Sequence, residues 1–266
     1  MFITLFAMEC FTYHLIFIVH IVHSTVIIGM PKEDIATMSP ILLVLSLALP
    51  AFTSKYLAQQ PMKMFLYGLQ FKLFTSVLVW GVFQLAIVEY GTEGKDEADS
   101  EGGGPSLKFY AILLAVMSLN ELAGNLIFGA QMTFFAKISD PLIGGTYMTF
   151  LNTISNLGSK WPNFLSLWLL PKMSLSSCVS LASESSSVLM KGSCLGMEDE
   201  CRELGGQCEV TVDGYTVQQF CATALGILWI FFLGGRALNL ERAPAKEWLT
   251  TGEDTSYIIN KANKAI

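Results

Sequence analysis

Residues 139–162 read SDPLIGGTYMTFLNTISNLGSKWP, and this stretch decides how the rest of the chain is interpreted. It opens with Asp140 and Pro141, a signal for a turn and a helix start, because proline lacks an N–H that the first helical turn does not need. Gly144 and Gly145 follow in an otherwise apolar run. In lipid, small residues of this kind let two helices approach closely. The stretch therefore predicts a transmembrane helix with a specialised first turn.

A polar stripe runs along the predicted helix. Thr149, Asn152, Asn156 and Lys160 recur at helical spacing, which places them on one face. A polar stripe is costly in a bilayer unless it faces protein or a water-filled cavity. Two interpretations stay open: the helix lines a pore or cavity, or the stripe forms a hydrogen-bonded seam between helices.

The composition is that of a membrane protein. Hydrophobic residues make up 52% of the chain and charged residues 14%, whereas soluble domains carry roughly 25% charged residues. A net charge of −6 without a basic cluster argues against nucleic acid as a partner and leaves the lipid bilayer as the expected surrounding.

Six stretches are apolar and long enough to span a bilayer, which takes about 20 residues. The fold class expected is therefore an all-α membrane protein with six transmembrane helices. Residues 1–28 form an apolar N-terminal segment, expected to be the first helix, and residues 236–266 a mixed-charge tail. The other expected helices are residues 35–52, 64–88, 107–135, 141–170 (ended by Pro171) and 217–235.

The third and fourth of these helices each contain an ionisable side chain near the middle of the span. Lys72 lies about nine residues inside the third, near mid-bilayer at ~1.5 Å rise per residue, so it suggests a functional cation; the alternative is a lysine that extends toward the headgroups. Asn120, Glu121 and Asn125 interrupt the fourth helix. Glu121 suggests a proton or substrate partner, or a hydrogen-bonded carboxyl that locks two helices together.

The loop over residues 172–213 holds Cys178, Cys194, Cys201 and Cys208. Four cysteines in one polar loop indicate an oxidising compartment and up to two disulfides, with three full pairings open. A zinc site is the rival interpretation, but the loop has neither a Cys-x-x-Cys motif nor a histidine, so we expect disulfides and no metal.

Six spans put both termini on one side of the membrane. If that side is the cytosol, the short inner connections carry lysines such as Lys55, Lys63 and Lys137, and the outer loops carry the acidic run and the four loop cysteines. Positive residues inside and disulfides outside agree on this orientation.

The chain also resembles a known family. The stretch at residues 139–162 is similar to the acetyl-coenzyme A transporter family, a branch of the major facilitator superfamily. The resemblance extends over residues 29–235. It includes GMPKED at Gly29–Asp34, SKY at Ser54–Tyr56, CRELGGQC at Cys201–Cys208, DGY at Asp213–Tyr215 and FFLG at Phe231–Gly234. Residues 1–28 do not share it.

The resemblance implies that these six helices are the C-terminal half of a major facilitator fold, which binds its substrate between two halves. A missing N-terminal half or a homodimer partner is then required. It also implies acetyl-CoA transport across the endoplasmic reticulum or Golgi membrane, in exchange for CoA, by alternating access, without covalent chemistry or a cofactor. Phosphate groups need cations, and Lys72 and Lys160 are the lysines well within the spans. The full set of residues expected at the substrate is Lys72, Asn120, Glu121, Asn125, Thr149, Asn152, Asn156 and Lys160.

Other functions stay open. The chain is half a transporter in length, so it is alternatively a non-transporting partner or regulator of a full-length relative. Within transport, a permease for another anionic solute is the second choice, because a fold does not determine a substrate. The transporter is expected to be a solute:proton symporter or antiporter. An enzyme is not expected. A membrane acyltransferase would need a catalytic histidine or nucleophile near the membrane interface, and the histidines of this chain, His14, His20 and His23, lie in the N-terminal segment that does not share the resemblance.

Overall fold

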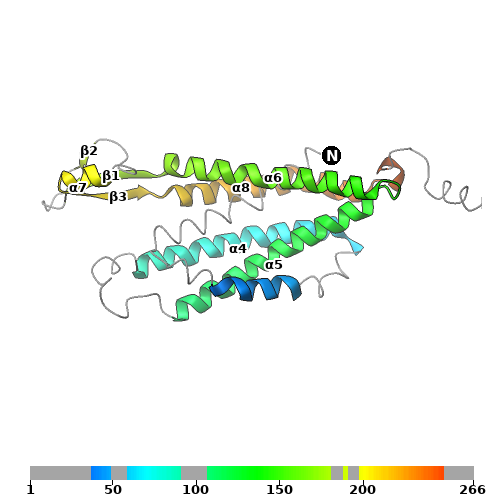
Figure 1. Cartoon of the computed structure of the whole chain (residues 1–266), viewed down its shortest axis with the longest axis horizontal. Helices are drawn as coiled ribbons and strands as arrows, with labels where there is room; N and C mark the ends of the chain where they lie inside the picture. The colour runs from blue at the N-terminus through cyan, green and yellow to red at the C-terminus, as the bar shows by residue number, and fades with distance from the viewer. Residues whose placement is uncertain (1–36, 49–58, 91–106, 181–187, 191–197, 249–266) are drawn as a thin grey trace, which may run out of the picture.

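The computed structural model describes residues 37–48, 59–90, 107–180, 188–190 and 198–248. Four long helices dominate this part of the chain (Figure 1). They are α4 (Pro61–Tyr90), α5 (Leu107–Ile138), α6 (Gly144–Met173) and α8 (Gly214–Arg242). A shorter apolar helix covers Thr37–Ala48, and its Met38 packs against the cluster of Val79 and Phe83 on α4.

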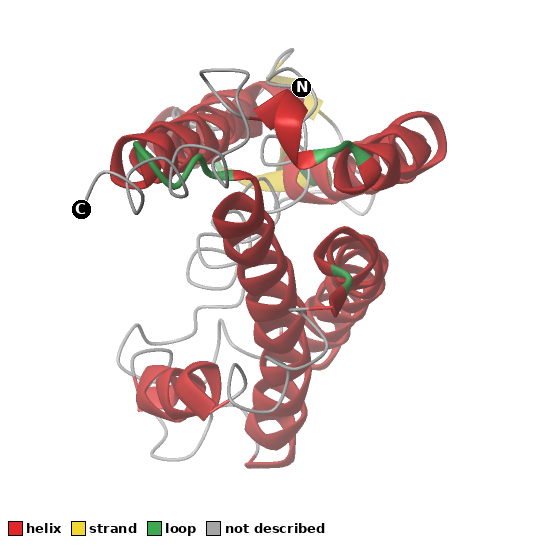
Figure 2. Ribbon diagram, turned by 90° about the vertical axis from the view of Figure 1, so that its right-hand side faces the viewer, coloured by secondary structure: helices red, strands yellow, loops and turns green. Residues whose placement is uncertain are grey.

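The four helices form two layers. In Figures 1 and 2, α6 lies beside α8 in one layer, and α4 lies beside α5 in the other. The layers meet where α4 packs on α8 and where the end of α5 leads into α6. The shared core contains Phe65, Phe134 and Trp229, from three different helices.

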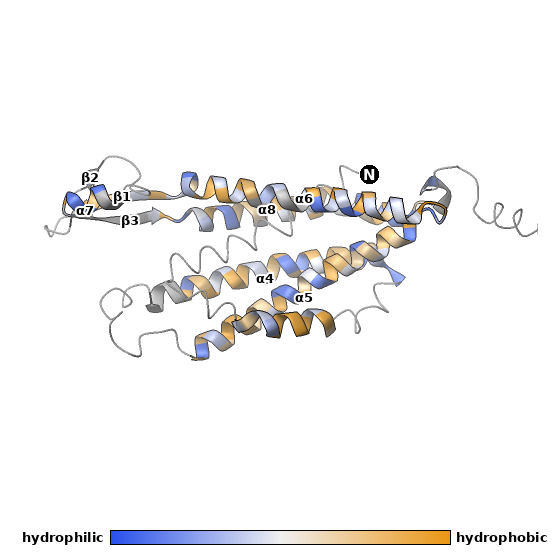
Figure 3. Ribbon diagram, viewed as in Figure 1, coloured by the Kyte–Doolittle hydropathy of each residue, from blue (hydrophilic) through white to orange (hydrophobic). Residues whose placement is uncertain are grey.

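α4, α5 and α8 expose large apolar side chains and bury polar ones. Phe74, Phe128 and Phe231 are exposed, whereas Thr75 and Gln131 are buried, and Figure 3 shows the polar positions within otherwise hydrophobic α4 and α5. This arrangement is the reverse of a soluble core and suits a protein whose solvent is lipid. The segments long and apolar enough to cross a membrane, among the described residues, are Pro61–Leu85, Leu107–Ile138 and Gly214–Arg242. The chain is therefore a mostly helical membrane protein.

Three further spans were expected from the sequence. Residues 1–28 lie outside the described part of the chain, and the second expected span is described as the helix Thr37–Ala48. The fifth is α6, which is 30 residues long and less apolar than its neighbours. The six-span count and the half-transporter fold stay predictions.

Both ends of α6 differ from the sequence prediction. Pro141 does not start the helix, because the Asp140 carboxylate accepts the Leu142 N–H at 2.9 Å and closes a separate turn. The helix begins at Gly144. Pro171 does not end it either: a proline so close to the end removes few hydrogen bonds, and the helix continues to Met173.

The last span is also longer than expected. α8 continues past residue 235 to Arg242, and a short 3-10 helix, η1 (Ala245–Trp248), follows. Trp248 packs edge-on against Phe134 of α5, with ring centroids 6.1 Å apart. The start of the expected tail is thus part of the helical bundle.

The expectation of an all-α fold was wrong in the cysteine loop. The loop forms an antiparallel sheet of order β2-β1-β3, with α7 (Glu198–Glu203) beside it. The strands are β1 (Leu175–Ser180), β2 (Val188–Met190) and β3 (Gly206–Val212). Valine and threonine in β1 and β3 favour strands, but the sheet itself depends on pairing residues about 30 positions apart, which is a tertiary contact.

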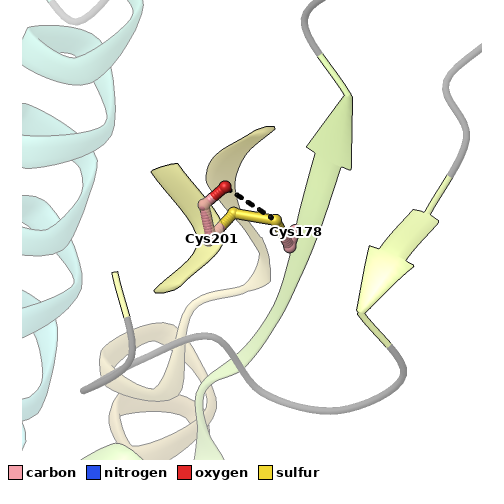
Figure 4. The surroundings of a disulfide bond; sticks show 2 residues. All are labelled: Cys178 and Cys201. Atoms are coloured by element: carbon pink, nitrogen blue, oxygen red, sulfur yellow. Dashed lines mark hydrogen bonds between the residues drawn. A yellow bond between two sulfur atoms is a disulfide. The ribbon is translucent and has the colours of Figure 1, made fainter. Parts of the chain in front are cut away.

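A disulfide fastens this sheet to α7. Cys178 of β1 is bonded to Cys201 of α7 (Figure 4), and both residues are fully buried. The predicted oxidised loop is confirmed for this pair. Cys208 lies on β3 opposite Cys178, and Cys194 lies outside the described residues.

Candidate functional site

Lys72 lies in a buried polar cluster between α4 and α5. Its side chain is 3% exposed, and its Nζ donates a hydrogen bond to the main-chain oxygen of Asn120 at 3.3 Å. The Thr75 hydroxyl donates to Asn120 Oδ1 at 3.3 Å. Lys72 therefore points into the helix interface instead of extending toward the headgroups.

Glu121 is the acidic residue of this cluster. It interacts electrostatically with Lys72 across the α4–α5 interface. One turn further along α5, Asn125 Nδ2 donates to the Glu121 main-chain oxygen at 3.0 Å and to its Oε1 at 3.4 Å. The structure thus brings together Lys72, Asn120, Glu121 and Asn125, four of the eight residues that the sequence suggested as substrate ligands.

Polar contacts that the sequence prediction missed join α8 to its neighbours. Gln219 Nε2 donates to Ser76 Oγ of α4 at 3.3 Å, and Gln218 Nε2 donates to the Ser166 main-chain oxygen of α6 at 3.0 Å. Both glutamines are buried. The signal that could have found them is the Gln-Gln pair inside an apolar span, because buried amides need hydrogen-bond partners.

Glu241 ties the ends of three helices on the side opposite the sheet. Its Oε2 accepts the main-chain N–H of Met62 at the start of α4, at 3.2 Å. Its Oε1 lies 3.5 Å from Nζ of Lys137 at the end of α5. At the other end of α8, the Thr216 hydroxyl accepts hydrogen bonds from Trp80 and Gln84 of α4. α4 and α8 are thus joined at both ends.

The polar stripe of α6 faces away from this bundle. Thr149, Asn152 and Asn156 are exposed, whereas the opposite face of α6 buries Leu151 and Ser155. Ser155 Oγ accepts a hydrogen bond from Gln131 of α5 at 2.8 Å. The stripe is therefore not a seam with α4, α5 or α8. Lys160 lies on α6, but its side chain is outside the described part.

Within the described part of the chain, the glycines of the first α6 turn make no close contact with another helix. A Cβ at Gly144 or Gly145 would meet nothing within 4 Å among the described residues. Close approaches occur elsewhere, where a Cβ on Gly68 would lie 3.0 Å from Ile127 Cγ1 and one on Gly226 would lie 2.7 Å from Leu73 Cδ2.

Asp140 is buried at the turn before α6, where its carboxylate accepts the Leu142 N–H.

Comparison with known proteins identifies a family over most of the chain. The family profile described as "Acetyl-coenzyme A transporter 1" matches residues 24–250. An uncharacterised protein of Schizosaccharomyces pombe is 36% identical over 141 residues, which is 53% of this chain and 26% of that protein. An uncharacterised membrane protein of Saccharomyces cerevisiae is 26% identical over 151 residues, which is 56% of this chain and 26% of that protein.

The chain therefore spans about a quarter of the length of the curated relatives it matches. No solved structure matches it.

Proposed function

The chain belongs to the acetyl-coenzyme A transporter family, and from this premise we propose that it carries acetyl-CoA across the endoplasmic reticulum or Golgi membrane. The family is one of transporters and not of enzymes. We further propose that acetyl-CoA is exchanged for CoA by alternating access. The family match over residues 24–250 is the observation that carries this proposal.

The exposed stripe of α6 supports a transport path. Thr149, Asn152 and Asn156 are exposed on a helix whose opposite face packs in the bundle. Facing lipid, a polar side chain such as the Asn152 amide would lose hydrogen bonds to water, which would raise the free energy of the folded state. They suit a water-filled cavity, where they would hydrogen-bond the amides or the adenine of CoA. We place Lys160, on the same face by its spacing, near the phosphate groups.

The buried cluster of α4 and α5 acts differently in this proposal. Lys72 is hydrogen-bonded to the Asn120 main-chain oxygen inside the bundle, so it acts on an anionic substrate through its charge and not through direct contact in this conformation. Charges act over longer distances in a poorly polarisable interior than in water. Asn125 holds the Glu121 carboxylate that partly balances this charge.

The remaining cavity wall must come from another chain segment. The chain covers about a quarter of its relatives, and a transporter of the major facilitator type needs two halves around the substrate. We propose a missing N-terminal half or a second copy in this place. The same coverage favours one alternative, a half-molecule that binds or regulates a full-length relative.

The orientation proposed from the sequence has structural support. The disulfide-linked sheet lies at one end of the helices, and the C-terminal ends of α5 and α8, which carry Lys137 and Glu241, lie at the other (Figure 1). A disulfide suits the lumen, and lysines near the ends of spans suit the cytosol. We therefore place the termini in the cytosol.

The test is uptake of labelled acetyl-CoA into proteoliposomes that contain this chain, with and without CoA inside. We expect internal CoA to stimulate uptake, and Asn152→Leu with Asn156→Leu to lower it about tenfold or more, because two hydrogen bonds to the substrate are lost. Phe231→Leu, on an exposed apolar face of α8, is the control and should leave uptake unchanged.

The alternatives have distinct outcomes in this assay. Uptake only after the N-terminal half is added indicates that the chain is one half of the transporter. Binding to a full-length relative without uptake in either preparation indicates a regulatory partner. Uptake of another anion in preference to acetyl-CoA would refute the proposed substrate.

A further inference from the structure

We propose that the end of the helices opposite the sheet binds an anionic phospholipid. The lipid phosphate lies beside Lys63 and Arg242, and the acyl chains follow the apolar outer face of α4. The inference requires only that the chain lies in a membrane, so it does not depend on acetyl-CoA transport.

The two cations lie where α4 begins and α8 ends. Lys63 is the third residue of α4 and Arg242 the last residue of α8, and both are exposed. These two helix ends are joined, because Glu241 Oε2 accepts the Met62 N–H at 3.2 Å. Lys63 and Arg242 each follow directly after one partner of this hydrogen bond. The two cations therefore belong to one junction in the fold.

The carboxylate at this junction is already engaged. Glu241 is bonded to the Met62 N–H, and its Oε1 lies 3.5 Å from Nζ of Lys137. In the part of the chain that the structure describes, neither Lys63 nor Arg242 forms an ion pair. The exposed charged side chains left at this end are those of Lys63, Arg236, Arg242 and Glu247. The excess of cations is complementary to a phosphate group.

An apolar track continues from Lys63 along the outer face of α4. Tyr67 and Phe74 are four and eleven residues after Lys63, a spacing that keeps all three on one side of the helix. Both are exposed, and Leu78 is exposed one turn after Phe74. A cation at the rim of an apolar surface matches a phospholipid, which joins an anionic headgroup to apolar chains. A soluble phosphate or an acidic peptide would use the cations alone.

The sheet end of the helices carries different charges. Exposed carboxylates of α7, Glu200 and Glu203, accompany the exposed Arg202 there. Lys172 at the end of α6 lies over the Trp168 ring, 3.2 Å from its centroid. The charge difference between the two ends assigns the lipid to the leaflet opposite the sheet. In the orientation proposed above this is the cytosolic leaflet, where anionic lipids create a negative surface potential.

The experiment titrates the purified chain in neutral detergent with phosphatidylserine and follows thermal unfolding. A ligand that binds the folded state raises the unfolding temperature. We expect phosphatidylserine to raise it more than phosphatidylcholine does, and the difference to shrink at high salt. One cation near an anionic lipid surface contributes about fivefold to affinity, so Lys63→Gln with Arg242→Gln should lower the affinity for phosphatidylserine about tenfold or more.

The matched control also removes one lysine and one arginine. Lys108→Gln with Arg202→Gln neutralises two exposed cations toward the sheet end, and this variant should bind phosphatidylserine as the wild type does. If the Lys63 and Arg242 double variant does not fold, the two single variants replace it, and each should lower the affinity about fivefold.

A soluble headgroup tests the role of the apolar track. Glycerophosphoserine carries the phosphate without acyl chains, so we expect it to leave the unfolding temperature unchanged. Stabilisation by this compound equal to that by phosphatidylserine would show a simple anion contact and overturn the phospholipid assignment. Equal affinity for phosphatidylserine in the wild type and the Lys63 and Arg242 variants, or equal stabilisation by phosphatidylcholine, would overturn the site itself.

Discussion

Removing the Cys178–Cys201 disulfide should loosen the small sheet while the helices stay folded. The bond joins residues 23 positions apart. The loop-closure relation gives a stabilisation of about 3.4 kcal/mol at 25 °C for a loop of this length. At about 1.4 kcal/mol per factor of ten, this corresponds to a roughly 300-fold larger population of the open sheet.

The appropriate variant is Cys178→Ala with Cys201→Ala. Both side chains are fully buried, so alanine avoids the buried hydroxyl that serine would introduce. The readout is tryptic cleavage at Arg202, which lies exposed on α7 next to the disulfide. A protease cuts a helix only after local opening, so the cleavage rate follows the open population.

The control is Cys221→Ala, because Cys221 is a free, exposed cysteine of α8. We expect no change in cleavage at Arg202 for this variant and a large rise for the double variant. Reducing the wild type should reproduce the rise. A change of less than about tenfold in the double variant would refute the view that this disulfide, and not the strand pairing of β1 with β3, holds α7 in place.

Two further predictions concern the cysteines and the helix contacts. With Cys178 and Cys201 paired, peptide mapping without reductant should recover Cys194 linked to Cys208; two free thiols there would contradict a second disulfide. Gly214→Ala should destabilise the chain by about 1–3 kcal/mol, because the new Cβ would lie 2.5 Å from the Leu170 main-chain oxygen. Gly235→Ala, where a Cβ meets nothing within 4 Å, should instead stabilise by up to about 1 kcal/mol. Thermal unfolding of both variants in detergent tests this contrast, and equal shifts would contradict it.

The family relationship and the polar stripe together define what is particular about α6. The other long helices bury several polar residues in the bundle, such as Lys72 and Gln131. α6 instead leaves Asn152 and Asn156 exposed. This exposed face supports the proposal that the transport path runs along α6.

The sequence by itself determined the class of the protein and the approximate positions of the four long helices in the described part of the chain. Amino-acid composition indicates whether a protein is surrounded by lipid or by water, whatever its packing. The extent of an apolar run locates a span to within a few residues, as the start of α5 at Leu107 shows. Clustering of cysteines in one loop was enough to predict an oxidised segment, and the Cys178–Cys201 bond confirms it.

Tertiary structure decided which faces meet. Helical periodicity places Thr149, Asn152 and Asn156 on one face, but it does not identify the neighbour of that face, and only packing shows that the stripe points away from α8. The partners of Lys72 come from a helix 48 residues later, and the sheet of the cysteine loop forms from strands that pair at a distance. Contacts of this kind depend on how the chain folds back on itself, because each requires two segments that local sequence cannot relate.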